Sequence, residues 1–385
     1  MKRNRLILLG FIAAAAVFAS FFGGAFSYAL FYASLAVPLS CFIYLVFVYA
    51  RLKTYQTIES KIVVKGDKIG YKYILSNESS VHFASVKIEF LDDYSRVETA
   101  NNQDEISIAP ALRIERETSL VCLYRGEYKV GISAVIITDY LGIFTFRRSN
   151  PSVMNIRVYP RVVKLRTLGA LHFGDDVKSP PFSAKPGGEQ DTDLRAFMLG
   201  DSIKAINWKV SARYGELFTR RRAEPPKEKI AIFIDTSPIK GADKIPGEDR
   251  ILEAALALAD FYLERGIETE IIKPAVTLNR FQINNREDFL RFYDTCLLMS
   301  FFNMEAEEYL ENVTLDNAAV LVLITADCEK FIPALFNLSA IMNTCVILTG
   351  NRENNELSVL RESLGKTALV HIPEDAGISD VLERR

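Results

Sequence analysis

The spacing of apolar and polar residues changes along the chain and separates it into four stretches. The first contains two long uncharged runs, Leu6–Phe22 and Ala25–Ala50, which Gly23 and Gly24 separate. Each run approaches or exceeds the roughly 20 residues that cross about 30 Å of hydrocarbon. This pattern predicts a membrane anchor at residues 1–54, made of two transmembrane helices with a tight turn between them.

The charges that flank these runs predict the orientation of the anchor. Lys2, Arg3 and Arg5 precede the first run, Arg51 and Lys53 follow the second, and the connecting residues carry no charge. Because basic residues favour the cytoplasmic side, we expect a multi-pass protein of the inner membrane with both termini in the cytoplasm. A secretory signal has a similar start, but the second span follows at once and makes that alternative the weaker one.

Residues 55–160 show the two-residue period of β-strands. In Val86–Phe90, for example, apolar side chains alternate with Lys87 and Glu89, which places one face in a core and the other in water. Similar short runs recur, bounded by Gly, Asp, Asn or Ser, and no helical period lies between them. The stretch predicts an antiparallel β sandwich of immunoglobulin-like type.

Residues 229–385 alternate between apolar runs and helical periods. The continuous run Ile230–Ile234 is typical of a central parallel strand, and a helix is expected over Glu248–Arg265. Further strand and helix patterns follow as far as Thr367–His371, among them a strand over Val320–Thr325 and a helix over Lys330–Met342. This alternation predicts a doubly wound α/β sheet, in which ligands gather at the carboxyl ends of the strands.

Asp235 and Ser237 stand at such a strand end. They are similar to the D-x-S-x-S adhesion motif, whose carboxylate and hydroxyls hold a divalent cation such as Mg²⁺, although Ile239 replaces the second serine. Asp327 follows a later strand and is a candidate third ligand. One alternative is a strand-end aspartate that only accepts hydrogen bonds from backbone amides. Another is a metal-dependent hydrolase in which Asp235, Asp327 and Asp201 hold a cation that activates water.

The central stretch, residues 161–228, combines proline-rich loops with a dense polar block. Gly200-Asp201-Ser202 favours a helix start, after which Ile203, Ile206, Val210 and Tyr214 share one face. The candidate partner-binding residues of this block are Arg195, Asp201, Trp208, Lys209, Arg213 and Glu216. They suit a surface that binds carboxylates or phosphates. A buried network that docks a loop is an equal alternative, and catalysis is a more distant one.

This block resembles the signature of the bacterial domain-of-unknown-function-58 family. The matching residues are Arg195, Gly200-Asp201-Ser202, Ile206-Asn207-Trp208-Lys209, Ala212-Arg213 and Gly215-Glu216-Leu217. Asp139-Tyr-Leu-Gly-Ile-Phe is similar to the family's D-P-F-G-L-F element, from which Tyr140 and Leu141 depart. The resemblance implies a membrane hairpin, a β domain and a region similar to a von Willebrand factor A domain.

The same resemblance implies a partner, because such proteins are often encoded beside MoxR-type AAA+ ATPases. The sequence contains no convincing catalytic constellation. We therefore expect a non-enzymatic adaptor at the membrane that works with such an ATPase, with the metal-dependent hydrolase as the alternative.

Charge and cysteine content narrow the picture further. Residues 230–385 carry 14 basic and 26 acidic side chains, whereas residues 1–160 carry 18 and 13. An acidic surface repels nucleic acid and attracts basic partners, or only aids solubility. The five cysteines are scattered without a C-x-x-C pair, which indicates reduced, buried thiols rather than zinc ligands or disulfides.

Overall fold

The computed structural model describes residues 2–98, 105–150, 152–169, 192–197, 206, 208–222, 229–239, 244–274, 279–302, 305–313, 315 and 318–384. The chain divides into two compact units. The first is Met1–Arg161 with Cys296–Leu298, and the second is Val162–Thr295 with Met299–Arg385. Each unit has a hydrophobic core of its own.

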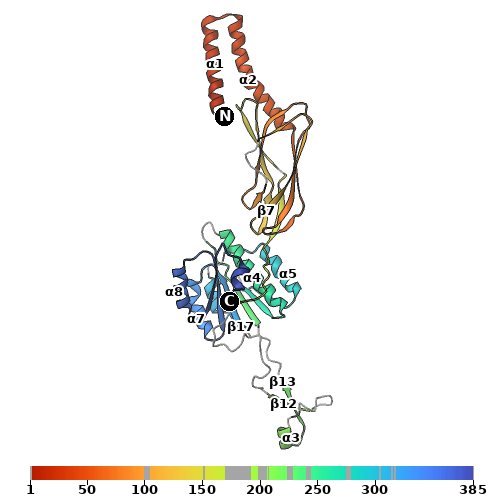
Figure 1. Cartoon of the computed structure of the whole chain (residues 1–385), viewed down its shortest axis with the longest axis vertical. Coiled ribbons are helices and arrows are strands. Elements are labelled where there is room, and N and C mark those ends of the chain that lie inside the picture. The colour runs from red at the N-terminus through yellow and green to blue at the C-terminus, as the bar shows by residue number, and fades with distance from the viewer. Residues whose placement is uncertain are drawn as a thin grey trace. The chain divides into compact units, whose positions relative to one another are not determined.

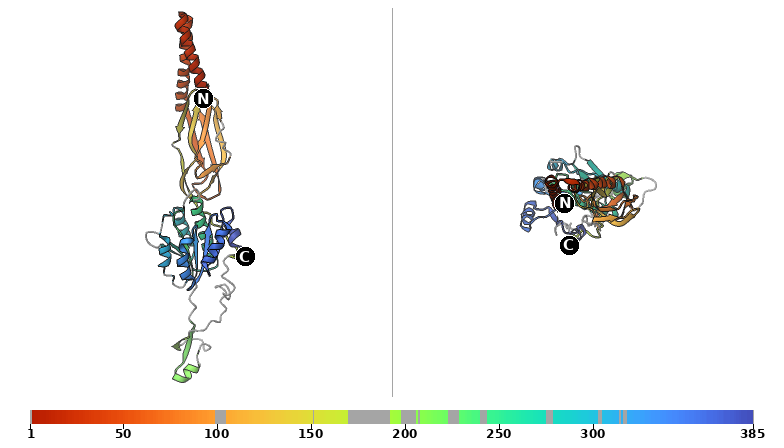
Figure 2. Two further views of the ribbon diagram at one scale, coloured as in Figure 1. Left: turned by 90° about the vertical axis from the view of Figure 1, so that its left-hand side faces the viewer. Right: turned by 90° about the horizontal axis from the view of Figure 1, so that it is seen from above.

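The first unit begins with two apolar helices that lie side by side (Figure 1, Figure 2). These are α1 (Lys2–Phe22) and α2 (Gly24–Arg51). Gly23 and Gly24 have φ angles of 61° and 84°, a left-handed conformation that glycine adopts without steric penalty. Both helices are long and apolar enough to cross a membrane. The two predicted apolar helices are therefore confirmed.

The last turns of α2 pack against the β domain. Leu45 and Val48 are fully buried in the same hydrophobic cluster as the strands. Phe42 makes edge contacts with Phe144 and Phe146, at ring-centroid distances of 6.2 and 5.8 Å. The last turns of α2 and the β domain therefore share one core.

The start of α1 contacts the same end of the β domain. The Asn4 side-chain amide donates a hydrogen bond to the carbonyl of Leu141 at 2.7 Å, and Arg5 Nε donates to the carbonyl of Ile143 at 2.6 Å. The two free ends of the hairpin thus lie on one side, at the β domain. The turn between α1 and α2 lies at the other end of the hairpin (Figure 1).

The described residues of the β domain form three sheets. They are β1-β3-β7-β5, β10-β9-β4-β6 and β2-β11-β8, and the first two are antiparallel throughout. In chain order the strands are β1 (Leu52–Ile58), β2 (Ile62–Val64), β3 (Lys68–Asn77), β4 (Phe83–Phe90), β5 (Ser95–Val97), β6 (Glu105–Ile108), β7 (Arg113–Cys122), β8 (Gly126–Val130), β9 (Ile132–Thr138), β10 (Thr145–Ser149) and β11 (Met154–Tyr159).

The alternation predicted for β4 is confirmed, because Val86, Ile88 and Phe90 are all buried. The parallel pairing of β2 with β11 departs from the all-antiparallel expectation. The immunoglobulin-like topology stays a prediction.

The second unit contains a short β12–α3–β13 segment. β12 (Thr192–Ala196) pairs antiparallel with β13 (Phe218–Arg222), and α3 (Trp208–Tyr214) lies between them in sequence. The predicted helix is wrong in extent. Ile206 is buried in a β-bridge before α3 begins, and Tyr214 is 67% exposed rather than part of a core face. Residues 201–205, where that helix was expected to begin, lie outside the described residues.

The rest of the unit is an α/β fold. Its elements are β14 (Lys229–Ile234), α4 (Lys244–Glu264), β15 (Thr269–Lys273), β16 (Asn279–Ile283), α5 (Arg286–Leu297), α6 (Ala306–Glu311), β17 (Ala318–Thr325), the 3-10 turn η2 (Glu329–Phe331), α7 (Ile332–Ser339), β18 (Asn343–Thr349), α8 (Asn354–Leu364), β19 (Ala368–Ile372) and α9 (Ile378–Leu382). The sheet order is β16-β15-β14-β17-β18-β19. All neighbours pair in parallel except β16, an antiparallel edge strand.

Helices cover both faces of this sheet. Ala231 and Phe233 pack in one cluster with side chains of α6, α7 and α8. Neighbouring residues on a strand point to opposite faces, so Ile232 and Ile234 face the side that α4 contacts. When the parallel strands are ranked in chain order, the sheet reads 2-1-3-4-5. The order therefore reverses between β14 and β17, the position where such sheets bind ligands.

Candidate functional site

Asp235 follows the last residue of β14, at the point where the strand order reverses. Its backbone N–H donates a hydrogen bond to the carbonyl of Ile324 on β17 at 2.9 Å, which holds the ends of the two strands together. Its side chain is 5% exposed. A buried carboxylate is costly unless charges and donors compensate it, so its partners define the site.

Each oxygen of the Asp235 carboxylate accepts hydrogen bonds from the protein. Oδ1 accepts from the backbone N–H of Ser237 at 2.9 Å and from the Ser237 hydroxyl at 2.5 Å. Oδ2 accepts from the hydroxyl of Thr325, the last residue of β17, at 2.7 Å. The alternative of a strand-end aspartate with backbone amide donors thus describes part of the geometry.

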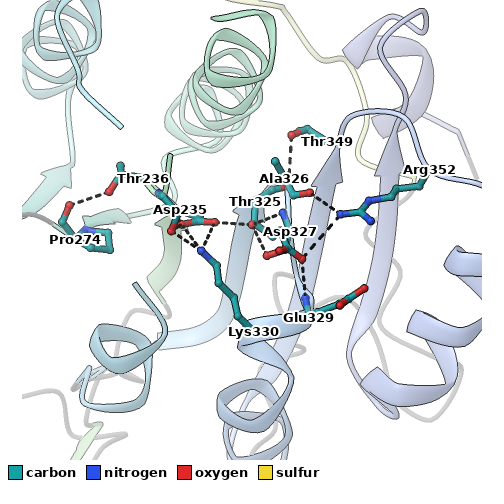
Figure 3. Close-up of polar contacts among 11 residues, drawn as sticks. Asp235, Thr236, Pro274, Thr325, Ala326, Asp327, Glu329, Lys330, Thr349 and Arg352 are labelled. Atoms are coloured by element: carbon teal, nitrogen blue, oxygen red, sulfur yellow. Dashed lines mark hydrogen bonds and ion pairs between the residues drawn. The ribbon is translucent and has the colours of Figure 1, made fainter. Parts of the chain in front are cut away.

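A lysine completes this arrangement (Figure 3). The ammonium group of Lys330 lies 3.2 Å from Oδ2 and 3.3 Å from Oδ1 of Asp235, and it also donates to the Ser237 hydroxyl. Lys330 belongs to η2, in the connection that follows β17. Its side chain is 24% exposed and lies over the Phe331 ring. The strand end is therefore a compact, partly buried ion pair with two hydroxyl groups.

Asp327, the candidate third ligand, is engaged with other partners. Its Oδ1 accepts a hydrogen bond from the backbone N–H of Glu329 at 3.3 Å and lies 3.9 Å from the Arg352 guanidinium. Thr325 links the two aspartates, because its hydroxyl also accepts from the Asp327 backbone N–H at 2.9 Å. Figure 3 shows the Asp327 carboxylate paired with Arg352 rather than with Lys330.

The structure thus brings Asp235 and Ser237 together and gives Asp327 a separate ion pair. Ile239 supplies no oxygen at the second serine position of the motif. The metal-dependent hydrolase has Asp201 as a further candidate ligand, which lies outside the described residues, so that hypothesis stays a prediction.

Cys328 lies beside this site as an inert thiol. Burial first, and then the negative charge of Asp327, raise the pKa of Cys328 to about 11. Because the thiolate is the nucleophilic form, Cys328 is unreactive at neutral pH. All five cysteines are buried, as the sequence predicts.

Two members of this site were missed by sequence reasoning, Thr325 and Lys330. Both had a weak signal in the sequence. Thr325 ends a predicted strand, and Lys330 opens the predicted helix that follows that strand. Lys330 follows the candidate metal ligand Asp327 by three residues. A basic residue so close to a candidate metal site suggests that an ammonium group, rather than a metal ion, could neutralise Asp235.

Five of the six candidate partner-binding residues lie in the β12–α3–β13 segment. The sixth, Asp201, lies outside the described residues. Arg195 lies in β12 opposite Thr219. Trp208, Lys209 and Arg213 belong to α3 and are exposed, and Glu216 is exposed in the turn that follows. The structure therefore gathers three of the candidates on one short helix.

Local hydrogen bonds define the end of α3. Gly215 has a φ angle of 74°, and its N–H donates to the carbonyl of Ser211 at 2.9 Å, a glycine cap typical of helix ends. The buried Ser211 hydroxyl accepts from the N–H of Phe218, the first residue of β13, at 2.9 Å. These bonds hold α3 against β13 and leave Trp208 62% exposed.

Residues 193–270 match the model of a family described as Protein of unknown function DUF58. This segment is DUF58-like. The DUF58 match supports the resemblance that the sequence motif suggested. It contains Trp208, Arg213, Asp235 and Ser237, whereas Lys330 lies outside it. A von Willebrand factor A-like fold for the remainder stays a prediction.

Three solved structures show distant likenesses to the chain that carries this DUF58 segment. Proximal thread matrix protein 1 from the mussel byssus is 13% identical with a TM-score of 0.31, over 40% of this chain and 46% of that chain. A Salmonella alpha-2-macroglobulin mutant is 12% identical with a TM-score of 0.22, over 28% and 7%. The cupredoxin domain of amoB from Nitrosocaldus yellowstonii is 10% identical with a TM-score of 0.21, over 36% and 96%.

The chain spans less than half of the mussel protein. Likenesses with such low TM-scores do not define the fold of this chain. No curated protein matches the chain.

Proposed function

We propose that this protein is a membrane-anchored, non-enzymatic adaptor whose α3 surface binds a cytosolic protein. The observation that carries the proposal is the exposure of large apolar and basic side chains together on and beside one short helix. Trp208, Tyr214 and Leu217 are 62%, 67% and 43% exposed, and Lys209 and Arg213 lie among them. Aromatic and arginine side chains are enriched where proteins bind one another.

The charge of this segment indicates the chemistry of the partner. The described residues 192–197, 206 and 208–222 include six basic residues and two acidic ones by sequence. Arginine forms bidentate hydrogen bonds with carboxylates, so the partner is expected to present an acidic surface with an apolar pocket for Trp208. A MoxR-type AAA+ ATPase is the partner class that the family resemblance suggests.

The anchor supports the membrane location of this adaptor. Two apolar helices are long enough to cross a bilayer, and both free ends of the hairpin lie at the β domain, which supports a location of that domain next to the membrane. The basic residues at those ends favour the cytoplasmic side. The adaptor is therefore proposed to present its α3 surface on the cytoplasmic side of the inner membrane.

Binding to a purified ATPase tests the proposal directly. The full chain, reconstituted in lipid nanodiscs, is incubated with a purified MoxR-type AAA+ ATPase, and the dissociation constant is measured with ATP and with ADP. Trp208→Ala and Arg213→Glu are each expected to weaken binding by about tenfold or more, the loss typical of a central interface anchor.

Phe336→Ala is the matched control, because Phe336 is an equally exposed aromatic residue on α7, at 68%. It is expected to leave binding unchanged. A complete lack of binding by the intact chain contradicts the choice of partner. Binding that neither α3 variant weakens contradicts the assignment of the surface.

A further inference from the structure

The ammonium group of Lys330 meets the same oxygen atoms that a metal ion would need at the end of β14. In a D-x-S motif the aspartate carboxylate and the serine hydroxyl are the cation ligands. Lys330 Nζ lies 3.2 and 3.3 Å from the two carboxylate oxygens of Asp235 and also contacts the Ser237 hydroxyl. One positive charge is thus already present at the mouth of the motif.

A divalent cation and this ammonium group do not fit together. Mg²⁺ binds oxygen at about 2.0–2.1 Å, closer than the ammonium nitrogen approaches Asp235. A metal ion at that distance from Asp235 and Ser237 would lie against the Lys330 nitrogen. Two cations at such a separation repel each other strongly where water is partly excluded.

The other candidate ligands are also engaged or missing. The side chain of Ile239 has no oxygen to offer. Asp327 accepts from the Glu329 N–H and pairs with Arg352. The wild-type residues therefore do not fit a metal ion, although the carboxylate itself is of the right type.

We infer that Lys330 is the built-in cation of this strand end: its ammonium group neutralises Asp235 in place of a metal ion and masks a divalent-cation site. Asp235 and Lys330 together carry no net charge, so the protein needs no metal here. The same ion pair ties the end of β14 to η2, the turn that leads into α7. This assignment stands independently of the adaptor role.

Removal of the ammonium group leaves the negative charge of Asp235 without its counter-ion. A buried carboxylate without its counter-ion is strongly destabilising. Asp235, the Ser237 hydroxyl and the Thr325 hydroxyl then remain as three oxygen ligands. Mg²⁺ and Mn²⁺ accept such sets and complete their coordination with water. The unmasked site is therefore expected to take a small, hard divalent cation.

The test uses the full chain in detergent micelles, freed of metal with EDTA, and Mn²⁺ as the probe. Binding is followed by electron paramagnetic resonance of free Mn²⁺, and thermal unfolding is recorded with and without Mn²⁺. The wild type is expected to show neither saturable Mn²⁺ binding at this site nor a shift in Tm. Lys330→Ala is expected to lose about 5 °C or more in EDTA, to bind one Mn²⁺ and to regain most of its Tm.

Lys366→Ala is the control, because it removes the same charge from an exposed position of the same unit. It is expected to behave as the wild type does. Asp235→Asn combined with Lys330→Ala removes both charges, and it is expected to be more stable in EDTA than Lys330→Ala alone and to bind no Mn²⁺. This pair of variants separates the loss of the ion pair from general damage to the fold.

Two outcomes overturn the inference. One is a wild type that binds Mn²⁺ saturably and loses that binding on Asp235→Asn, which would show that Lys330 does not exclude the metal. The other is a folded Lys330→Ala that binds no Mn²⁺. If Lys330→Ala does not fold, Lys330→Gln, which keeps most of the volume, is judged by the same two measurements.

Discussion

The hydroxyl of Thr325 connects the two aspartates that flank the reversal of strand order. Thr325 is fully buried, donates to Oδ2 of Asp235 and accepts from the backbone N–H of Asp327. A single oxygen thus satisfies one acceptor and one donor on adjacent strand ends. An apolar side chain of the same shape would fill the space and leave both groups without this partner.

Thr325→Val is therefore expected to destabilise the protein by about 1–3 kcal/mol, the cost of leaving buried polar groups unsatisfied. Denaturant titration of the full chain in micelles measures this loss as a change in the free energy of unfolding. Thr236→Val is the control, because Thr236 is equally buried but gives up only one hydrogen bond, to the carbonyl of Pro274. A Thr325→Val protein at least as stable as Thr236→Val would contradict the role given to Thr325.

At the residue scale, sequence reasoning found the aspartate and missed what neutralises it. The apolar run before Asp235 and the position of a strand end are local signals, so Asp235 and Ser237 could be singled out. The contact with Lys330 depends on β14 and β17 lying side by side, although 95 residues separate Asp235 from Lys330. No local period encodes that pairing.

At the element scale, the continuous apolar helix α2 has two environments, because one part of it is exposed and its last turns pack against the β domain. Its 28 residues exceed a bilayer crossing, and the sequence predicted a span over Ala25–Ala50. Leu45 and Val48 are fully buried with the β domain, whereas Leu39 is 60% exposed. Composition alone cannot distinguish side chains that face lipid from side chains that face protein, because both are apolar. The edge strand β16 was missed because most of its residues are polar, so that composition gave no sign of a strand.

This difference predicts that equivalent substitutions on one helix have unequal effects. Leu45→Ala is expected to lower the free energy of unfolding by about 2–5 kcal/mol, since it removes buried methyl groups and leaves a cavity. Leu39→Ala makes the same chemical change at an exposed position and is expected to have little effect. Denaturant titration in detergent micelles compares the two. Equal losses would show that α2 does not share the core of the β domain.

At the scale of the whole molecule, the proposed membrane location depends on where the two free ends of the hairpin lie. Arg5 near the start of α1 and Val48 near the end of α2 both contact the β domain. If both helices cross a bilayer, as proposed above, this arrangement keeps the β domain on one side of it. The short turn at Gly23 is then expected to reach the opposite side.

Fusion proteins in a bacterial cell test which side this is. A fluorescent protein joined after Lys53 is expected to fluoresce, and alkaline phosphatase at the same place is expected to be inactive, because the flanking Arg and Lys residues favour the cytoplasm. Fusions after Gly24, which keep only α1, are the control and should behave in the opposite way. If phosphatase were active after Lys53, the α3 surface would face away from cytosolic ATPases. The adaptor proposal would then fail, whereas the pairing of Lys330 with Asp235 would be unaffected.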